Sequence, residues 1–253
     1  MKLKTIIALL FFLVLQQAQA QNATSDVVQT KKGPLTIQPI SHATMALNWN
    51  NKTIYVDPTG GAEAFSGIAA PDLILITDIH GDHLDMKTLE AINTSKAKLV
   101  VPQAVADKLS DALKSKAVVL ANGEETEQAG IAISAVPMYN LPEEPDSRHP
   151  KGRGNGYILN IGGKKIYLSG DTEGIEEVRS LDNIDVAFLS MNLPYTMDID
   201  QAASTTLDFK PKVIYPYHYR GQNGLSDVEA FKKKVEDSNS NIDVRLLSWY
   251  PNQ

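Results

Sequence analysis

The segment Thr77-Asp78-Ile79-His80-Gly81-Asp82-His83-Leu84-Asp85 decides the fold. It directly follows the apolar run 73–76, which is typical of a buried strand because branched side chains pack well on a pleated sheet. An unpaired charge is costly to bury, so the three aspartates and two histidines after this strand must be solvated, paired or bound to metal. Carboxylate and imidazole ligands together suit zinc, manganese or iron. The alternative is a solvated turn in which Asp85 caps a short helix.

Two later segments end predicted strands with further ligand-type side chains. Asp171 follows the strand 165–169 and Gly170, and His218 follows the strand 213–217. Each of them, taken alone, is more typical of a turn or of a structural histidine. Because side chains at strand ends can meet at one edge of a sheet, the three segments together predict a metal site there.

The composition indicates a folded protein, and the lack of a Pro/Ser-rich or repetitive linker after Lys31 favours one domain over two. Of the 253 residues, 43% are hydrophobic and 21% charged, which is enough for a substantial core and too apolar for a disordered protein. The chain has no cysteine, which excludes thiol catalysis, thiolate metal ligands and disulfides. The formal charge of −6 argues against nucleic-acid binding, because such proteins usually present a basic surface to phosphates. We therefore expect a small-molecule substrate and no nucleic-acid partner.

Residues 1–20 have the pattern of a secretory signal peptide. Lys2 and Lys4 precede an apolar run from Ile6 to Leu15, and Ala18-Gln19-Ala20 provides a small-residue cleavage site. The run is shorter than the about 20 residues that span a bilayer, which argues against a stable membrane anchor. We expect residues 21–253 to form one exported domain, in the periplasm if the source is a Gram-negative bacterium. The sequence sets no oligomeric state.

Alternating apolar runs and helical spacings predict sheets covered by helices. Gly162-Gly163 predicts a tight hairpin, since both glycines tolerate the positive φ that such a turn requires. The expected strands are 35–40, 44–49, 53–56, 73–77, 98–101, 117–120, 131–136, 156–161, 165–169, 186–189, 213–217 and 244–249. The expected helices are 86–92, 104–113, 175–180, 199–209 and 227–235.

The chain resembles a known family over nearly the whole of its length after the leader. The likeness lies in short motifs and in their order and spacing. These are His42-Ala43-Thr44, Val56-Asp57-Pro58, the segment 78–85, Val136-Pro137-Met138-Tyr139-Asn140, His149-Pro150-Lys151, Gly156-Tyr157, Ser169-Gly170-Asp171-Thr172, Tyr195-Thr196-Met197-Asp198 and Pro216-Tyr217-His218-Tyr219. Together they resemble the metallo-β-lactamase-fold hydrolases, and most closely the branch of L-ascorbate-6-phosphate lactonase-like enzymes.

The resemblance implies an α/β fold, a four-layer αββα sandwich of mixed sheets and outer helices, with two metal ions at one edge of the sheets. By the matching motifs, His80 binds the first ion, Asp82 and His83 bind the second, Asp171 bridges both and His218 completes the second position. The ions are expected to be divalent, with zinc favoured over manganese or iron.

The first position departs from the family motif, which begins with histidine where this chain has Asp78. Aspartate adds negative charge and favours harder ions, so it is expected to change or weaken that position. His149 is the expected remaining ligand there, with Asn140 lining the pocket. The competing interpretation makes His149 a lid residue or a solvated side chain. His42 and Asp57 are expected to support the ligands, since metal-bound imidazoles need a partner for their other nitrogen, although His42 is equally typical of a core residue.

Two divalent ions in such a site lower the pKa of water toward neutrality and so supply hydroxide to attack an ester, lactone, amide or phosphoester bond. Asp82 is the expected acceptor of the water's proton, and Tyr195 is a candidate donor to the developing oxyanion, with packing as its alternative role. Arg148, Lys151 and Arg153 either contact an anionic substrate or form an exposed basic loop. The functional alternative is an exported metal- or ligand-binding protein of the same fold with little or no turnover.

Overall fold

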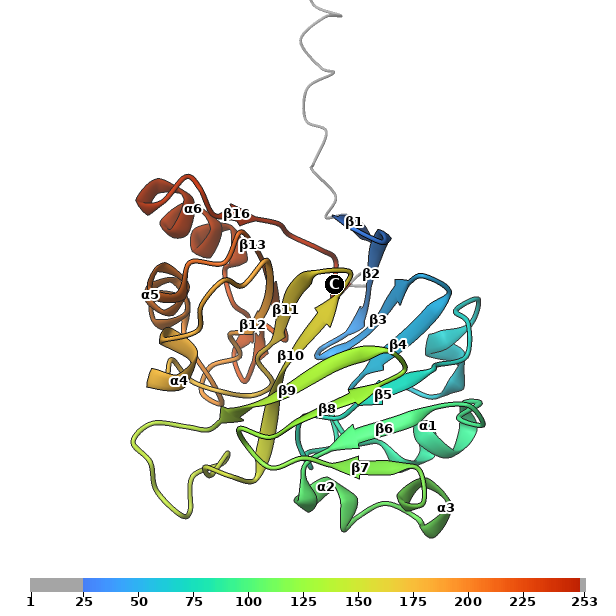
Figure 1. Cartoon of the computed structure of the whole chain (residues 1–253). Coiled ribbons are helices and arrows are strands. Elements are labelled where there is room, and N and C mark those ends of the chain that lie inside the picture. Colours follow the sequence, from blue (N-terminus) through green and yellow to red (C-terminus); the bar gives the residue numbers. More distant parts are fainter. Residues whose placement is uncertain (1–24, 251–253) are drawn as a thin grey trace, which may run out of the picture.

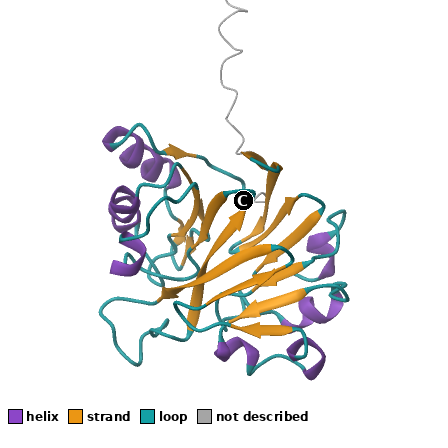
Figure 2. Ribbon diagram, in the orientation of Figure 1, coloured by secondary structure: helices purple, strands orange, loops and turns teal. Residues whose placement is uncertain are grey.

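The protein is described by a computed structural model that covers residues 25–250. The expected signal peptide, residues 1–20, lies outside the described residues. Two seven-stranded sheets lie against each other, and helices flank both of them (Figures 1 and 2). This arrangement confirms the α/β sandwich with mixed sheets that the sequence led us to expect.

The first sheet takes up the first half of the described chain. Its strands lie in sequence order, so each strand pairs with the next one along the chain. The first four pair antiparallel and the last four pair parallel. The strands are β1 (Asp26–Thr30), β2 (Gly33–Ser41), β3 (Thr44–Trp49), β4 (Lys52–Val56), β5 (Leu73–Leu75), β6 (Lys98–Val101) and β7 (Ala117–Val119).

The second sheet has the order β16-β13-β12-β11-β10-β9-β8. Its strands from β8 to β11 pair antiparallel, and those from β11 to β16 pair parallel. The strands are β8 (Glu125–Gln128), β9 (Ile131–Met138), β10 (Gly154–Ile161), β11 (Lys164–Leu168), β12 (Val186–Ser190), β13 (Val213–Tyr217) and β16 (Asp243–Val244). A small ribbon of β14 (Arg220–Gly221) and β15 (Gly224–Leu225) stands apart.

Helices from each half of the chain lie beside the sheet of the same half. In Figure 1, α1, α2 and α3 flank the first sheet, and α4, α5 and α6 flank the second. The helices are η1 (Ala62–Phe65, a 3-10 turn), α1 (Met86–Ala91), α2 (Gln103–Ala106), α3 (Asp111–Lys114), α4 (Glu176–Arg179), α5 (Ile199–Phe209) and α6 (Val228–Ser238). None of the helices within residues 25–250 combines the length and apolar character that crossing a membrane requires.

The strand before the deciding segment explains why that segment lies at a sheet edge. Successive side chains of a strand point to opposite faces. Leu73 and Leu75 join the core between the sheets, whereas Ile74 and Ile76 join the core under the outer helices, where Leu89 of α1 also lies. A strand buried on both faces has a continuous apolar sequence, and it ends where polar residues begin. The polar segment 77–85 therefore starts at the edge of the sheet.

Local signals in the sequence set the turns as predicted. Gly162 and Gly163 have φ of 58° and 81° and connect β10 to β11 through the pair Ile161 and Lys164, which confirms the hairpin. The side chain of Asp85 accepts hydrogen bonds from the backbone N–H groups of residues 87 and 88, so it caps α1.

The single helix expected over 104–113 is wrong. The chain forms α2 and α3 instead, because Ser110 has an extended backbone with φ −64° and ψ 157° and begins a new helix. Val105 and Leu113 are nevertheless both buried in the outer core. Two short helices therefore provide the buried face in place of one.

The strand expected over 244–249 is also mostly wrong. Only Asp243 and Val244 pair with β13, although Leu247 and Trp249 are buried. Trp249 packs edge-on against Tyr217, with ring centroids 5.6 Å apart. Burial here comes from side-chain packing without a strand ladder. The edge strands β1 and β8 were not predicted, because the apolar part of β1 is only Val27-Val28 and β8 has no apolar residue.

Candidate metal centre

Strands from both sheets deliver polar side chains to one edge of the sandwich. Asp57 directly follows β4, and Asp78 comes three residues after the end of β5. In the second sheet, Asp171 comes three residues after β11, and His218 directly follows β13. Because the strands that precede these residues run parallel within each sheet, their carboxyl ends lie at the same edge.

Three residues at this edge have an uncommon backbone conformation. His42, Asp57 and His218 have φ of 50°, 44° and 46°. Side chains other than glycine rarely adopt positive φ, and such residues cluster at functional sites where the surrounding structure holds them. A hydrogen bond of 3.1 Å from the His218 N–H to the His42 carbonyl joins two of them across the sheets.

Asp78, His80 and His149 form the first of two groups whose ligand atoms all lie within 4.8 Å of one another. Oδ2 of Asp78 lies 2.6 Å from Nδ1 of His80. The rings of His80 and His149 meet edge to face with centroids 5.0 Å apart. Asp78 and His149 are buried. One carboxylate and two imidazoles are a usual ligand set for zinc, manganese or iron.

Asp82, His83 and His218 form the second group under the same limit. Oδ2 of Asp82 lies 3.2 Å from Nε2 of His218, and its Oδ1 lies 3.9 Å from Nε2 of His83. Partial burial raises the pKa of Asp82, but the hydrogen bond to His218 and the charges of both histidines hold it well below its usual range. Asp82 is therefore ionised at neutral pH.

Asp171 lies between the two groups and reaches both. Its Oδ2 is 3.3 Å from Nε2 of His149 and 3.3 Å from Nε2 of His83. Its Oδ1 is 3.5 Å from Nε2 of His218. Burial opposes ionisation, but His218 and His83 hold the pKa of Asp171 well below its usual value. An ionised carboxylate that faces ligands of both groups has the position of a bridging ligand.

Asp57 fixes the orientation of His83 from the side away from Asp171. Its Oδ2 lies 2.8 Å from Nδ1 of His83, and it accepts two further bonds of 2.7 Å from the N–H and hydroxyl of Thr77. Complete burial raises the pKa of Asp57 in spite of these contacts. With Nδ1 engaged by Asp57, Nε2 of His83 is the nitrogen that faces the metal groups.

Asn140 lies behind His149 and supports it. Its Oδ1 is 3.0 Å from Nδ1 of His149, and its Nδ2 donates to Glu173 and to the carbonyl of Tyr195. The sequence interpretation had placed Asn140 in the pocket wall. The structure gives it a contact with a candidate ligand, of the kind also expected for His42 and Asp57.

His42 lies beside the second group and outside it. Its ring meets that of His218 edge-on, with centroids 5.5 Å apart, and its Nδ1 is 3.4 Å from the hydroxyl of Tyr250. Burial and the neighbouring charge of His218 lower the pKa of His42. His42 is thus a packing neighbour of a candidate ligand.

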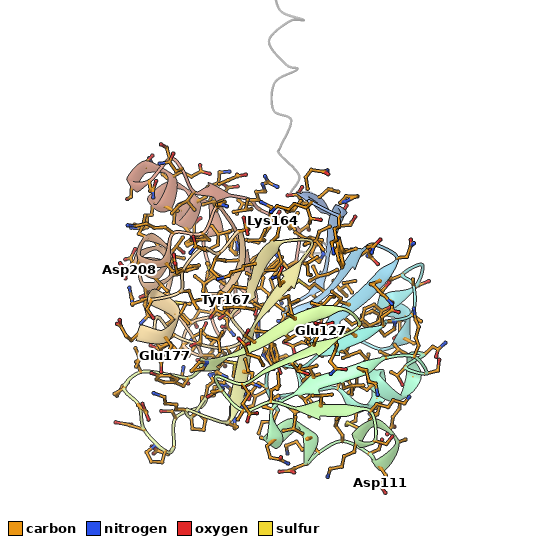
Figure 3. The ribbon with its side chains drawn as sticks, in the orientation of Figure 1. Asp111, Glu127, Lys164, Tyr167, Glu177 and Asp208 are labelled. Atoms are coloured by element: carbon orange, nitrogen blue, oxygen red, sulfur yellow. The ribbon has the colours of Figure 1, made fainter. Side chains whose placement is uncertain are left out.

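The three basic residues of the loop before β10 make three different contacts. Arg148 lies over the ring of Tyr195, 4.4 Å from its centroid, and the backbone carbonyl of Tyr195 accepts a hydrogen bond from Nδ2 of Asn140. Lys151 pairs with Glu177 at 3.1 Å. Figure 3 labels Glu177, which belongs to α4, so this ion pair joins the loop to that helix.

Arg153 differs from the other two basic residues because it enters the metal edge. Its Nε and Nη2 donate to the two oxygens of Asp78, each at 3.1 Å. Sequence reasoning missed this pair, because nothing in the spacing of Asp78 and Arg153 marks them as partners. It also missed Asn192, whose Nδ2 lies 3.5 Å from Nε2 of His218. Asn192 follows β12 by two residues, and this strand-end position could have identified it.

Several buried atoms of the two groups lack hydrogen-bond partners among the described residues. They include Nε2 of His83, Nε2 of His149, Nδ1 of His218 and Oδ1 of Asp171. A buried polar atom without a partner is costly, so a cluster of them indicates a missing ligand. Nitrogen and carboxylate atoms that face one another fit divalent metal ions, which accept lone pairs from both.

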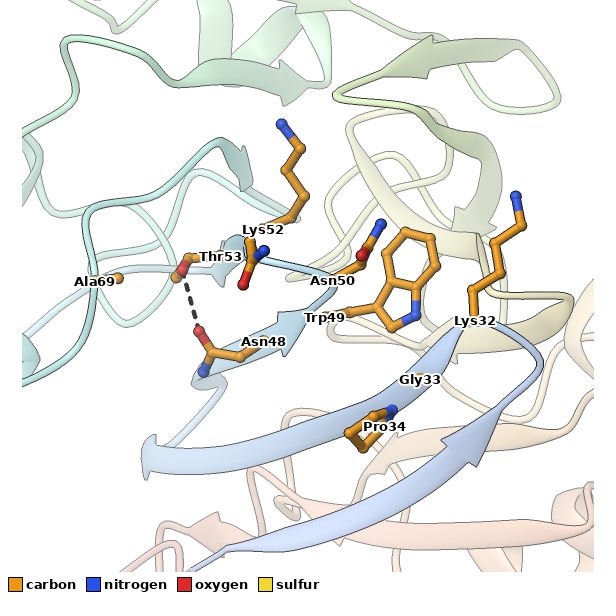
Figure 4. A pocket seen from close by; sticks show the side chains of 10 residues that line it. Lys32, Gly33, Pro34, Asn48, Trp49, Asn50, Lys52, Thr53 and Ala69 are labelled. Atoms are coloured by element: carbon orange, nitrogen blue, oxygen red, sulfur yellow. Dashed lines mark hydrogen bonds between the residues drawn. The ribbon is translucent and has the colours of Figure 1, made fainter.

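The pocket drawn in Figure 4 lies elsewhere in the fold. It has a volume of about 590 Å³ and is lined by Lys32, Trp49, Lys52 and several asparagines. Lys52 begins β4, whereas Asp57 follows its end, so the pocket opens at the opposite end of that strand. No histidine or carboxylate is among the described residues of its lining.

Comparisons with known proteins agree with this geometry. The model of the beta-lactamase superfamily domain matches residues 36–218. A UPF0173 metal-dependent hydrolase of Pyrococcus abyssi is 32% identical over 211 residues, which cover 78% of this chain and 91% of the relative. A homologous hydrolase of Pyrococcus horikoshii is 31% identical over 208 residues, with the same coverage.

Solved structures show the same likeness. A crystallised protein of Parabacteroides distasonis, named as a metal-dependent hydrolase, has a TM-score of 0.78 and 38% identity, over 88% of this chain and 97% of its own. A metallo hydrolase of Ignicoccus hospitalis has a TM-score of 0.70 and 25% identity, over 84% and 94%. The double sheet and its edge site thus define a metal-dependent hydrolase of the metallo-β-lactamase fold. Within that class, the chain belongs to the UPF0173 metal-dependent hydrolase family.

Proposed function

We propose that this protein hydrolyses an ester, lactone or phosphoester bond of a small molecule with two divalent ions held at the sheet edge. The observation that supports this most directly is the position of Asp171, within 3.5 Å of histidines from both ligand groups. The resemblance to L-ascorbate-6-phosphate lactonase-like enzymes favours lactones and phosphoesters among the substrates.

The residues of the two groups are the proposed ligands. Asp78, His80 and His149 would hold the first ion, and Asp82, His83 and His218 the second, with Asp171 shared. Zinc suits this set of imidazoles and carboxylates, and manganese or iron would also fit it. When bound, the ions would polarise the scissile group and lower the pKa of water so that hydroxide is available near neutral pH.

Asp82 is the proposed acceptor of the proton of the attacking water. Its side chain is 39% exposed, whereas that of Asp171 is 4% exposed, so Asp82 is the carboxylate that solvent reaches. One of its oxygens is engaged by His218, and the other lies 3.9 Å from His83. An ionised carboxylate with one oxygen held and the other accessible can orient water and accept its proton.

The experiment compares two matched substitutions of aspartate. The purified protein is expected to contain about two metal ions per chain and to hydrolyse members of a panel of esters, lactones and phosphodiesters. D171N should lower that hydrolysis by at least about a hundredfold, because it removes the shared ligand. D185N changes a carboxylate outside the site and should retain hydrolysis. Unchanged hydrolysis by a folded protein freed of metal would refute the proposal.

A binding protein with little turnover is the second candidate function. The observation in its favour is Asp78, which replaces the first histidine of the family motif and has both oxygens bonded to Arg153. This candidate predicts bound metal and no hydrolysis across the same panel. We also propose export of residues 21–253 to the periplasm, as the leader pattern indicates, with no nucleic-acid partner and no stable membrane anchor.

A further inference from the structure

Asp78 is the residue at which this chain departs from its family motif, and its partner lies far away in sequence. Nε of Arg153 donates to Oδ1 and Nη2 donates to Oδ2, each at 3.1 Å. The Asp78 side chain is completely buried, and that of Arg153 is 20% exposed. Two parallel hydrogen bonds between a guanidinium and a carboxylate fix both direction and distance, which a lysine cannot do.

The same carboxylate also faces the first ligand group. Oδ2 of Asp78 lies 2.6 Å from Nδ1 of His80. A carboxylate oxygen has more than one lone pair. Oδ2 can therefore accept from Arg153 and still present a lone pair toward the point that His80 and His149 face.

The backbone around Arg153 is held firmly against the Asp78 segment. The N–H of Asn155 donates to the carbonyl of Thr77 at 3.0 Å. At Gly154, a Cβ atom would come within 2.8 Å of that same carbonyl, so only glycine permits the approach. Arg153 also lies four residues after His149, and one loop therefore supplies both a candidate ligand and the partner of Asp78.

Formal charge explains why an arginine is useful there. The family motif, with histidine first, leaves two carboxylates among the candidate ligands, Asp82 and Asp171. Asp78 adds a third negative charge. The positive charge of Arg153 returns the net formal charge of the site to the value that it has with histidine at the first position. Without Arg153, the described partner left to the buried carboxylate of Asp78 would be His80, whose imidazole is neutral when it binds a metal, and a buried charge without a cationic partner is costly.

We propose that Arg153 is a positioning residue that holds the carboxylate of Asp78 oriented as a ligand, so that the two residues together replace the histidine of the family motif. The proposal rests on the metal site of the proposed function. It also implies that the first position favours a harder ion such as Mn²⁺ more than a histidine site does. The fork of Arg153 is occupied by Asp78, which removes it from the residues expected to contact substrate.

A double-mutant cycle on metal binding tests the proposal. The four proteins are the wild type, D78H, R153Q and D78H/R153Q, and the readout is the affinity for Zn²⁺ and for Mn²⁺ alone, by calorimetry and elemental analysis. Each single variant should bind the first ion at least about tenfold more weakly, D78H because its imidazole lies against an unpaired guanidinium. The double variant should recover Zn²⁺ affinity to within about threefold of the wild type and prefer Zn²⁺ over Mn²⁺ by about tenfold more than the wild type does.

Two further variants keep the result interpretable. R153K retains the positive charge without the two parallel hydrogen bonds of the guanidinium. Its affinity for the first ion should lie between those of the wild type and R153Q. R245Q breaks an arginine–aspartate contact at the distant β1 and β16 edge, where Arg245 meets Asp26 at 3.1 Å, and should bind both ions as the wild type does. Circular dichroism and melting of the metal-free proteins show whether each variant folds.

The outcomes separate this proposal from the proposed function. Additive losses in the cycle, or two ions bound to R153Q with wild-type affinity, would overturn the role of Arg153 alone. A wild type that binds two ions without hydrolysing the panel would overturn the proposed hydrolysis. The double-mutant cycle would still test the role of Arg153, because it measures metal affinity. A wild type that binds no metal would overturn both.

Discussion

The side-chain oxygen of Asn140 lies 3.0 Å from Nδ1 of His149 and also accepts the backbone N–H of that residue at 2.8 Å. The amide of Asn140 is itself oriented, because its Nδ2 donates to Glu173 and to the carbonyl of Tyr195. This chain of bonds makes Nδ1 of His149 the donor and leaves Nε2 to face Asp171. Asn140 therefore sets which nitrogen of His149 is available to a metal.

N140A should weaken binding of the first ion by about tenfold to a hundredfold, which is usual when the partner of a ligating histidine is removed. N140D keeps the accepting oxygen and should lose much less affinity. Metal content after equilibration at a buffered free Zn²⁺ concentration measures both variants. Equal occupancy of N140A and the wild type would show that His149 needs no such partner.

Asp57 should be as important for the second ion. D57N keeps the size of the side chain but offers His83 a neutral amide. We expect the variant to bind the second ion tenfold to hundredfold more weakly than the wild type does. D57A also leaves the buried N–H of Thr77 unpaired, which should cost a further roughly 1–3 kcal/mol of unfolding free energy. Calorimetric metal titration and urea unfolding of the metal-free proteins separate the two effects. Equal stability of D57A and D57N would contradict the second one.

The sequence predicted the fold well where local chemistry decides it. The apolar run 73–76 identified a strand buried on both faces, and Asp85 and Gly162-Gly163 identified a helix start and a hairpin. The ligand-type residues were found because they stand at the ends of predicted strands, where the topology brings them together.

What the sequence did not show depends on contacts between distant segments. The pair of Asp78 and Arg153 spans 75 positions, and the bond of Asn140 to His149 depends on the path of a loop. The turn between α2 and α3 arose from the extended backbone of Ser110, which apolar periodicity does not encode. Such features become visible only when three-dimensional packing is known.

Asp185 gives a pH-dependent contribution to stability outside the site. Asp185 directly precedes β12. Its carboxylate accepts hydrogen bonds from the ammonium groups of Lys212 at 2.8 Å and Lys164 at 3.0 Å, and from the backbone N–H of Lys165 at 3.0 Å. Partial burial opposes ionisation, but these bonds lower the pKa of Asp185 below its usual value. A lowered carboxyl pKa adds stability above the unfolded value near 3.9, and this stability is lost as pH falls through the folded value.

D185N should therefore reduce the unfolding free energy by about 1 kcal/mol between roughly pH 5 and 8. The difference from the wild type should shrink as pH falls through the lowered folded pKa of Asp185, because both proteins then carry a neutral side chain. Urea unfolding at several pH values measures it. A difference that stays constant down to pH 2 would mean that lost packing, and not lost charge, destabilises the variant.

Metal binding near neutral pH should release a proton from His83. In the metal-free protein burial opposes protonation, but Asp171 and Asp57 raise the pKa of His83 well above its usual value, so its imidazole is charged at pH 7. The stabilisation that this charge gives the metal-free fold is present below about pH 6.5 and is lost as pH rises through the raised pKa. A metal needs the unprotonated Nε2, and it therefore displaces about one proton.

Apparent affinity for the second ion should then rise by about tenfold per pH unit until the raised pKa of His83 is passed. Calorimetry at pH 7 in two buffers of different ionisation enthalpy counts the proton, and D57N, which removes one of the two carboxylates responsible, should release less than the wild type. A heat of binding independent of the buffer would show that His83 is already neutral before the ion arrives.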